Sequence, residues 1–140
     1  MANGFNPQGV WGPKGRGFNM GVIQHQGHII HITGQVAWDE NEQIVGKGDV
    51  ETQTRQCFMN IQAVLQSVGG TMEDVVSVTT YFTDRSQLAA IQRVRAEFLT
   101  EKTAPASTSI MVAGLGHEDF LVELTPVAVV PKDRFVALTT

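Results

Sequence analysis

The sequence predicts a single domain of the α+β class, and three observations lead to this prediction. Its 140 residues match the usual size of one domain and suffice for one hydrophobic core. Two stretches carry apolar residues at helical spacing, and several short runs are rich in β-branched residues. Their order, ββ-α-β-α-ββ, predicts a mixed sheet with both helices on one face.

The N-terminal part divides into an irregular arm and the first strands. Residues 1–17 are rich in glycine, proline and asparagine and have no hydrophobic period, which predicts an irregular arm. From Gly21 onward, two short β-rich runs are separated at Gln26 and Gly27. Because glycine can supply the positive φ of a tight turn, we expect these two runs to form a hairpin.

The first helix is expected directly after Asp49. Aspartate is a preferred capping residue at helix N-termini, and Gly69 with Gly70 provides a C-terminal stop. The apolar face of this helix comprises Cys57, Phe58, Ile61, Val64, Leu65 and Val68. The run that follows, Val75–Phe82, is dense in β-branched residues and predicts a strand buried largely on both faces.

The second helix is expected to begin at Asp84, which forms the pattern of a capping box with Gln87. One of its faces is marked by Leu88, Ile91, Val94, Arg95 and Phe98. Two strands then follow, at Ser107–Leu115 and Phe120–Val130, joined by a polar turn at 116–119. Since two helices can cover only one face of this sheet, we expect a homo-oligomer to bury the other face.

Composition argues against several classes of function. The net charge of −4, with Lys and Arg scattered along the chain, argues against nucleic acid as a partner. No apolar run approaches the ~20 residues of a membrane helix, and the N-terminus does not resemble a signal peptide. We therefore expect a cytoplasmic protein without a membrane partner.

The sequence also gives no reason to expect a metal or a cofactor. His25, His28 and His31 do not share one face of a strand. His117 lies in a polar turn, where it is either surrounded by solvent or lines a pocket at a subunit boundary. Cys57 lies on the apolar face of a helix and is expected to be a packing residue. Neither a P-loop nor a strand followed by GxGxxG is present, so no nucleotide cofactor is expected.

Glu123 is the most informative single residue, because it lies in an apolar strand. Strand alternation places it on one face with Leu121 and Thr125. A carboxylate that loses hydration there tends toward a raised pKa, which suits general acid–base chemistry. A position at a sheet edge, in water or paired with an arginine, explains the residue equally well. Ser107, Thr108 and Ser109 likewise fit either hydrogen bonds to the backbone or contact with a ligand.

Several short motifs follow one another along residues 18–130. They are Ile32-Thr33-Gly34-Gln35, the helix stretch 53–61, Val75 to Asp84, Pro105-Ala106 and Val122-Glu123-Leu124. In their order and spacing they resemble the motifs of the RidA (YjgF) family. The resemblance implies a fold like that of chorismate mutase, a homotrimer, and a small-molecule cleft at each subunit interface. It also implies one domain over residues 18–131, followed by a C-terminal tail at 132–140.

The resemblance implies a set of site residues, with one departure from the family. Active members hydrolyse imines and enamines, and an arginine after Pro-Ala grips the substrate carboxylate; this chain has Ser107 at that position. The family glutamate that positions the attacking water matches Glu123. The remaining expected site residues are Thr33, Gly34, Ser109, Phe18 in place of a tyrosine, and Gln92 in place of an asparagine.

Three functions follow from this comparison. The first is a cofactor-free hydrolase or deaminase in which Glu123 orients water toward an imine-like carbon, with an atypical substrate because Ser107 replaces the arginine. The second is a non-catalytic module that binds a small metabolite or a partner on the same trimer. The third is ribonuclease activity or inhibition of translation, and the acidic net charge counts against it.

Overall fold

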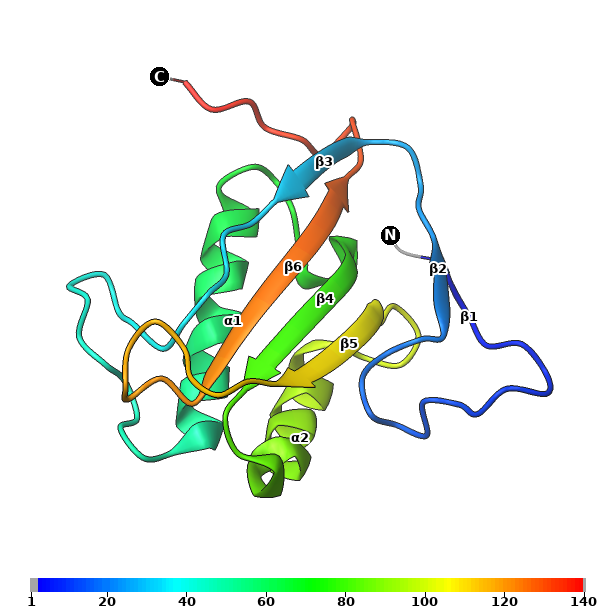
Figure 1. Cartoon of the computed structure of the whole chain (residues 1–140). Coiled ribbons are helices and arrows are strands. Elements are labelled where there is room, and N and C mark those ends of the chain that lie inside the picture. Colours follow the sequence, from blue (N-terminus) through cyan, green and yellow to red (C-terminus); the bar gives the residue numbers. More distant parts are fainter. Residues whose placement is uncertain (1–2, 140) are drawn as a thin grey trace.

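The computed structural model describes residues 3–139 and has two sheets (Figure 1). The smaller sheet pairs β1 (Asn3–Phe5) with β2 (Gly21–Ile23). The larger sheet has the strand order β3-β6-β4-β5. Its strands are β3 (His28–His31), β4 (Val75–Phe82), β5 (Ala106–Met111) and β6 (Val122–Val130). Strand β6 is antiparallel to both neighbours, whereas β4 and β5 are parallel, so the sheet is mixed.

Both helices lie behind the larger sheet in the view of Figure 1. Helix α1 (Val50–Gln66) contacts β6, and α2 (Leu88–Phe98) packs beside α1. The core between this layer and the sheet contains Cys57, Phe58, Ile61, Leu65, Ile91, Val94, Val122 and Leu124. This arrangement confirms the predicted α+β class, with two helices on one face of a mixed sheet.

The signals at the helix starts are confirmed in part. Asp49 caps α1, and its side chain accepts a hydrogen bond from the Thr52 N–H. Asp84 instead caps a 3₁₀ turn (Arg85–Gln87) through the Ser86 N–H, and α2 begins only after this turn. The expected capping box with Gln87 is therefore wrong. Val64 is 37% exposed and does not belong to the buried face of α1.

The predicted hairpin around Gln26 and Gly27 is also wrong. Strand β2 pairs with β1, within the segment expected to be irregular, and β3 pairs with β6. The His25 ring makes a 2.8 Å hydrogen bond to the Val129 carbonyl, and Gly27 lies against the backbone of Val130. An ideal Cβ at Gly27 would approach the Val130 oxygen closely, so this glycine permits a close crossing of two chain segments.

The last two strands are shorter than predicted and are not neighbours. The segment 112–121 forms a loop, longer than the turn expected at 116–119, and β4 lies between β5 and β6. Because β4 and β5 are parallel, the chain between them crosses over through α2. Strand β6 pairs with the other edge of β4, so β5 and β6 are not neighbours. No helix among residues 3–139 is long and apolar enough to cross a membrane.

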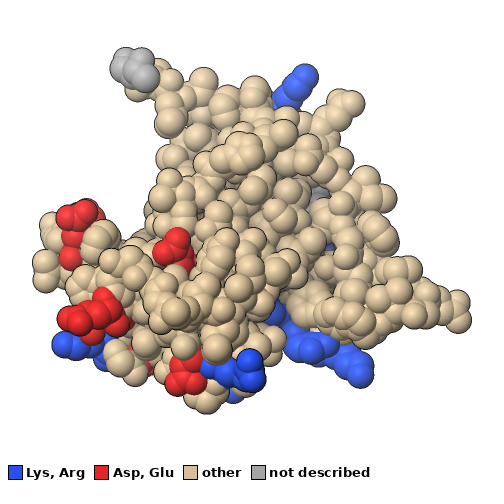
Figure 2. Space-filling model, viewed as in Figure 1, with Lys and Arg blue, Asp and Glu red and all other residues tan. Residues whose placement is uncertain are grey.

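Figure 2 shows the sheet face opposite the helices, and few charged side chains lie over its strands. Ile29 is 52% exposed and Ile110 is 41% exposed on this face. From Ser77 to Phe82 the residues of β4 alternate between half-buried and buried, so this part of the strand is fully buried on the helix side alone. At the start of the strand Val75 and Val76 are both buried, and Val76 packs with Val129 in a second, smaller cluster. The expectation of burial on both faces is therefore wrong for a single chain. We name this surface the open face.

Candidate functional site

Glu123 lies near the start of β6, a central strand, with its side chain on the open face. It is half-buried and lies opposite Tyr81 of β4. Among residues 3–139, no hydrogen-bond donor or basic side chain pairs with its carboxylate. The edge position and the arginine pair considered from the sequence are thus both absent. Its oxygens are available to a ligand or a water molecule.

Gly34 lies directly against this carboxylate because the chain after β3 bulges. His31 pairs with Val127 and Gln35 pairs with Leu124, so residues 32–34 face only residues 125 and 126. The extra residue is typical of a β-bulge. Pro126 lacks the N–H that a regular ladder would need here. Thr33 and Gly34 line a cavity of about 500 Å³ beside this bulge.

Replacing Gly34 with alanine should displace the Glu123 carboxylate while leaving the fold intact. An ideal Cβ at Gly34 would lie 3.0 Å from the Glu123 carboxyl carbon and closer still to Oε2. The flexible end of the glutamate can move, so we expect the free energy of unfolding to change by about 1 kcal/mol or less. A crystal structure of the variant and a urea melt measure the two effects.

Gly116→Ala is the matched control, because no atom lies within 4 Å of its ideal Cβ. An unmoved Glu123 side chain in Gly34→Ala would contradict the proposed role of Gly34 as the space that admits this carboxylate.

Three more of the expected site residues, Ser107, Ser109 and Phe18, lie at the edge strand β5 around Arg95, which is not among the expected site residues. The Arg95 guanidinium of α2 donates from Nη1 to Ser107 Oγ at 3.1 Å and to Ser109 Oγ at 3.4 Å. It also lies 5.7 Å from the centre of the Phe18 ring. Phe18 and Ser107 line a cavity of about 280 Å³ with Trp11, Asn19, Met20, Ser77, Val78, Thr79, Ala106 and Thr108.

Gln92 lies one turn before Arg95 on α2, and it lines a separate depression with Arg16. The Arg16 guanidinium carbon lies 5.5 Å from the centre of the Phe18 ring, so Arg16 is adjacent both to Gln92 and to the residues at β5. Its own side chain donates to the carbonyls of Gly12 and Pro13, each at 2.9 Å. Gln92 therefore lies beside the β5 group but outside its cavity.

A single chain does not bring Glu123 and Ser107 together. Tyr81 of β4 pairs with Glu123 of β6 on one side and with Ile110 of β5 on the other. Glu123 and Ile110 therefore lie level with each other, two strands apart. Ser107 is three residues further along, so the two lie roughly 10 Å apart across the sheet and roughly 10 Å along it. Alternation also directs their side chains to opposite faces. One small ligand cannot contact both within one chain.

Arg95 is the residue that the sequence interpretation missed. The helical spacing places it on one face of the second helix with Ile91, Val94 and Phe98, and this pattern assigns no role to its charge. The structure buries it to 1% exposure. Because arginine is almost never fully buried without a partner, an arginine within an apolar stripe was the available signal.

Cys57 and the histidines are explained by packing. Burial raises the pKa of the Cys57 thiol to about 12, and the Glu123 charge acts in the same direction. A thiol in this state is a poor nucleophile. His28 stacks on Phe135 with ring centres 3.9 Å apart, and His117 Nδ1 accepts the Asp119 N–H at 3.0 Å. Among residues 3–139, no three His, Cys, Asp or Glu side chains converge as a metal site would require.

Comparison with known proteins identifies the family. The sequence model of the family described as "Endoribonuclease L-PSP" matches residues 16–130. The chain belongs to the RidA/YjgF family. Two curated relatives are the RutC family protein slr0709 of Synechocystis and the RutC family protein PH0854 of Pyrococcus horikoshii. They are 40% and 35% identical to this Rid-family chain, over 74% and 73% of it, and 79% of each relative is covered.

Solved structures agree with this assignment. The Rid-family protein YyfB of Yersinia pestis has a TM-score of 0.86 at 33% identity, with 92% of this chain and 98% of that chain covered. RidA of the Antarctic bacterium Psychrobacter has a TM-score of 0.68 at 28% identity, with coverages of 81% and 88%. The resemblance drawn from the motifs is confirmed, and the fold is that of the Rid family.

Proposed function

We propose that this Rid-family protein is a cofactor-free hydrolase of a small imine- or enamine-like metabolite. The observation that carries the proposal is the half-buried Glu123 carboxylate, which has no partner among residues 3–139 and lies against Gly34. A carboxylate held in this way can accept a proton from water, as general base catalysis requires. Thr33 directly precedes Gly34, so its polar groups belong to the same bulged segment that faces β6.

The reaction balances with water as the only co-reactant. Glu123 accepts a proton from water as the water oxygen bonds to the imine carbon. It returns that proton to the nitrogen, which gives a carbinolamine. The carbinolamine hydroxyl then passes its proton to the nitrogen through Glu123, the carbon–nitrogen bond breaks as the carbonyl forms, and ammonia leaves. An enamine first takes a proton on carbon to become the imine.

We further propose that the protein is a homotrimer whose clefts join Glu123 of one subunit to the β5 group of the next. Three features support this assembly: the open face, its exposed Ile29 and Ile110, and the separation of Glu123 from Ser107 within one chain. Apolar surface of this kind is typical of interfaces. Light scattering should give three times the chain mass, and a monomer would overturn the interface clefts.

Glu123→Gln should lower kcat/KM for imine hydrolysis by at least about 100-fold, because it removes the general base. Ammonia release from a panel of carboxylated and neutral imines measures this loss. Glu101→Gln is the matched control, since Glu101 is exposed and its side chain makes no hydrogen bond or ion pair within residues 3–139. If no imine turns over, or if the variant equals the parent, the alternative of a non-catalytic metabolite-binding module replaces the hydrolase.

A further inference from the structure

A depression of about 260 Å³ lies where the N-terminal arm passes beside α2. Its lining residues are Gly15, Arg16, Ala89, Gln92, Arg93 and Ala96. The four residues from α2 are three or four positions apart, so they lie on one face of the helix. The arm approaches closely because an ideal Cβ at Gly17 would lie only 3.4 Å from the Ala96 backbone. Glu123 lies on the open face, across the sheet from α2, so the depression is separate from it.

Arg16 is held in position, and no acidic side chain within residues 3–139 pairs with it. Its Nε and Nη2 donate to the carbonyls of Pro13 and Gly12, each at 2.9 Å. Its guanidinium carbon lies 5.6 Å from the centre of the Trp11 ring and 5.5 Å from that of Phe18. Nη1 has no acceptor among the described residues. A side chain that is already ordered loses little conformational entropy when it binds a ligand.

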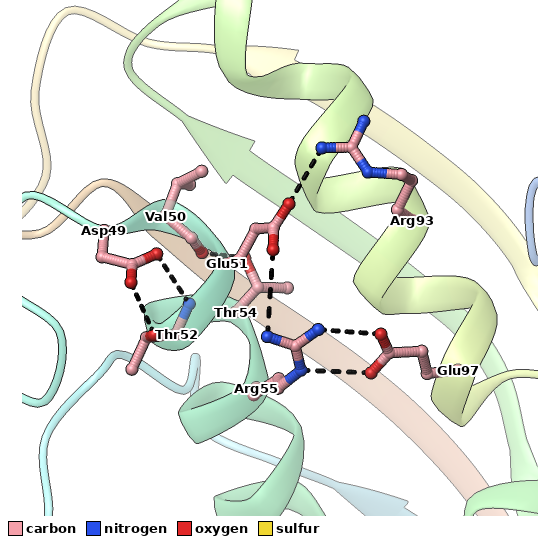
Figure 3. Close-up of polar contacts among 8 residues, drawn as sticks. All are labelled: Asp49, Val50, Glu51, Thr52, Thr54, Arg55, Arg93 and Glu97. Carbon is pink, nitrogen blue, oxygen red and sulfur yellow. Dashed lines mark hydrogen bonds and ion pairs between the residues drawn. The ribbon is translucent and has the colours of Figure 1, made fainter.

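Arg93 and Gln92 provide further donors on the helix side of the depression. Arg93 Nη2 pairs with Glu51 at 2.8 Å, and its Nε and Nη1 have no acceptor in the described part of the chain (Figure 3). Glu51 also pairs with Arg55, so it compensates the charge of Arg93 only in part. The Gln92 amide is half-buried and makes no hydrogen bond within residues 3–139. These groups are available to a ligand.

Positive charge exceeds negative charge around the depression. Lys14 is exposed, lies in the tight turn that the Arg16 N–H closes on the Pro13 carbonyl, and has no acidic partner within residues 3–139. Arg95 Nε donates to the Arg16 carbonyl at 3.1 Å. Burial and then the Arg16 charge lower the pKa of Arg95 to about 10, so Arg95 remains charged at neutral pH. In a chain of net charge −4, this local excess of cations attracts an anion.

We propose that this depression binds a phosphate group, either as inorganic phosphate or as the monoester of a small molecule. Guanidinium forks match the geometry of phosphate, and a dianion compensates two of them at once. Arg16 Nη1, the unpaired N–H groups of Arg93 and the Gln92 amide donate to the phosphate oxygens, while Lys14 adds charge beside them. The depression is smaller than the pockets that enclose whole drug-sized ligands, so the remainder of a monoester lies outside it.

NMR titrations at constant ionic strength test this site with inorganic phosphate, glycerol 3-phosphate and acetate. Phosphate should bind at least about ten-fold more tightly than acetate, because its charge is double, and should shift the signals of residues 15–17 and 89–96. Arg16→Gln and Arg93→Gln should each weaken phosphate binding by about five-fold or more. Arg85→Gln is the matched control, because it removes an exposed guanidinium that makes no hydrogen bond or ion pair within residues 3–139.

Arg93→Gln decides the question if Arg16→Gln does not fold, since the Arg93 side chain is 66% exposed and makes no hydrogen bond to the arm. Equal binding of phosphate and acetate, unchanged binding in Arg93→Gln, or an equal loss in Arg85→Gln would overturn the proposal. Glycerol 3-phosphate binding as tightly as phosphate assigns the site to phosphorylated metabolites, and its failure to bind assigns the site to inorganic phosphate. None of these results depends on imine hydrolysis at Glu123.

Discussion

Replacing Arg134 with alanine lowers the free energy of unfolding by about 2–3 kcal/mol, because it removes a charged partner of a buried carboxylate. The Asp74 side chain is 0% exposed, and both its oxygens accept hydrogen bonds from the Arg134 guanidinium, one of them at 3.0 Å from Nη1. Arg134 Nη1 also donates to the Gly69 carbonyl at 3.1 Å. These contacts of Arg134 connect the segment after β6 to the turns between α1 and β4. Urea denaturation followed by circular dichroism measures the loss.

The contribution of this pair depends on pH in a direction that its chemistry fixes. Burial acts to raise the pKa of Asp74, but hydrogen bonds from Arg134 and from the Thr71 N–H outweigh burial, and the pKa lies below its ordinary value. A carboxylate with a depressed folded-state pKa stabilises the protein above its unfolded pKa, and the stabilisation is lost as pH falls through the folded value. The difference between parent and variant should hold from about pH 5 to pH 8 and shrink below about pH 4.

Lys132→Ala is the control for the Arg134 variant, because it removes an exposed charge from the same segment. Its free energy of unfolding should match that of the parent within about 0.5 kcal/mol. A difference between Arg134→Ala and the parent that persists unchanged at pH 2 would show that the Asp74 charge is not the cause.

Gln53→Met lowers the free energy of unfolding by about 3 kcal/mol, since it removes three hydrogen bonds and keeps the side-chain volume. Gln53 is fully buried on α1. Its Nε2 donates to the carbonyls of Gly46 at 3.1 Å and Asp119 at 2.9 Å, and its Oε1 accepts the Leu121 N–H at 2.9 Å. The side chain joins the loop before α1 to the loop before β6, two residues ahead of Glu123.

Urea melts of Gln53→Met and of Gln66→Met separate this role from helix propensity. Gln66 is the last residue of the same helix, is exposed and makes no side-chain hydrogen bond within residues 3–139. Its substitution should change the free energy of unfolding by about 0.5 kcal/mol or less. Equal losses in the two variants would mean that the three backbone contacts of Gln53 do not stabilise the fold.

Features that depend on neighbouring residues could be predicted from the sequence. The bounds of β4 follow from a run of β-branched residues, and α1 follows from its Asp49 cap and from Gly69, which has φ +81° in the structure. These signals act within one or two turns of the chain, where propensity and capping dominate. The motifs that indicated the RidA/YjgF family also follow the order of the chain, and the comparisons confirm them.

Features that depend on distant partners could not be predicted in the same way. The expected hairpin at Gln26 and Gly27 would pair two adjacent segments. In the structure β2 pairs with β1 and β3 pairs with β6, and these partners are more distant in the sequence. The same holds for β5 and β6, which follow each other along the chain but are separated by β4. Pairing between strands depends on which faces can be buried together, and short β-rich runs do not specify this.

The sequence alone determined that this protein is an α+β member of the RidA/YjgF family with a carboxylate, Glu123, in an apolar strand. Only the tertiary structure decided what surrounds the expected site residues. It placed Gly34 against Glu123 through a bulge, set Ser107 on the opposite face, and brought Arg95 from α2 to the hydroxyls of β5. The physical reason is that burial and charge compensation are properties of packed neighbours, and Arg95 and Ser107 become neighbours only when the helix lies on the sheet.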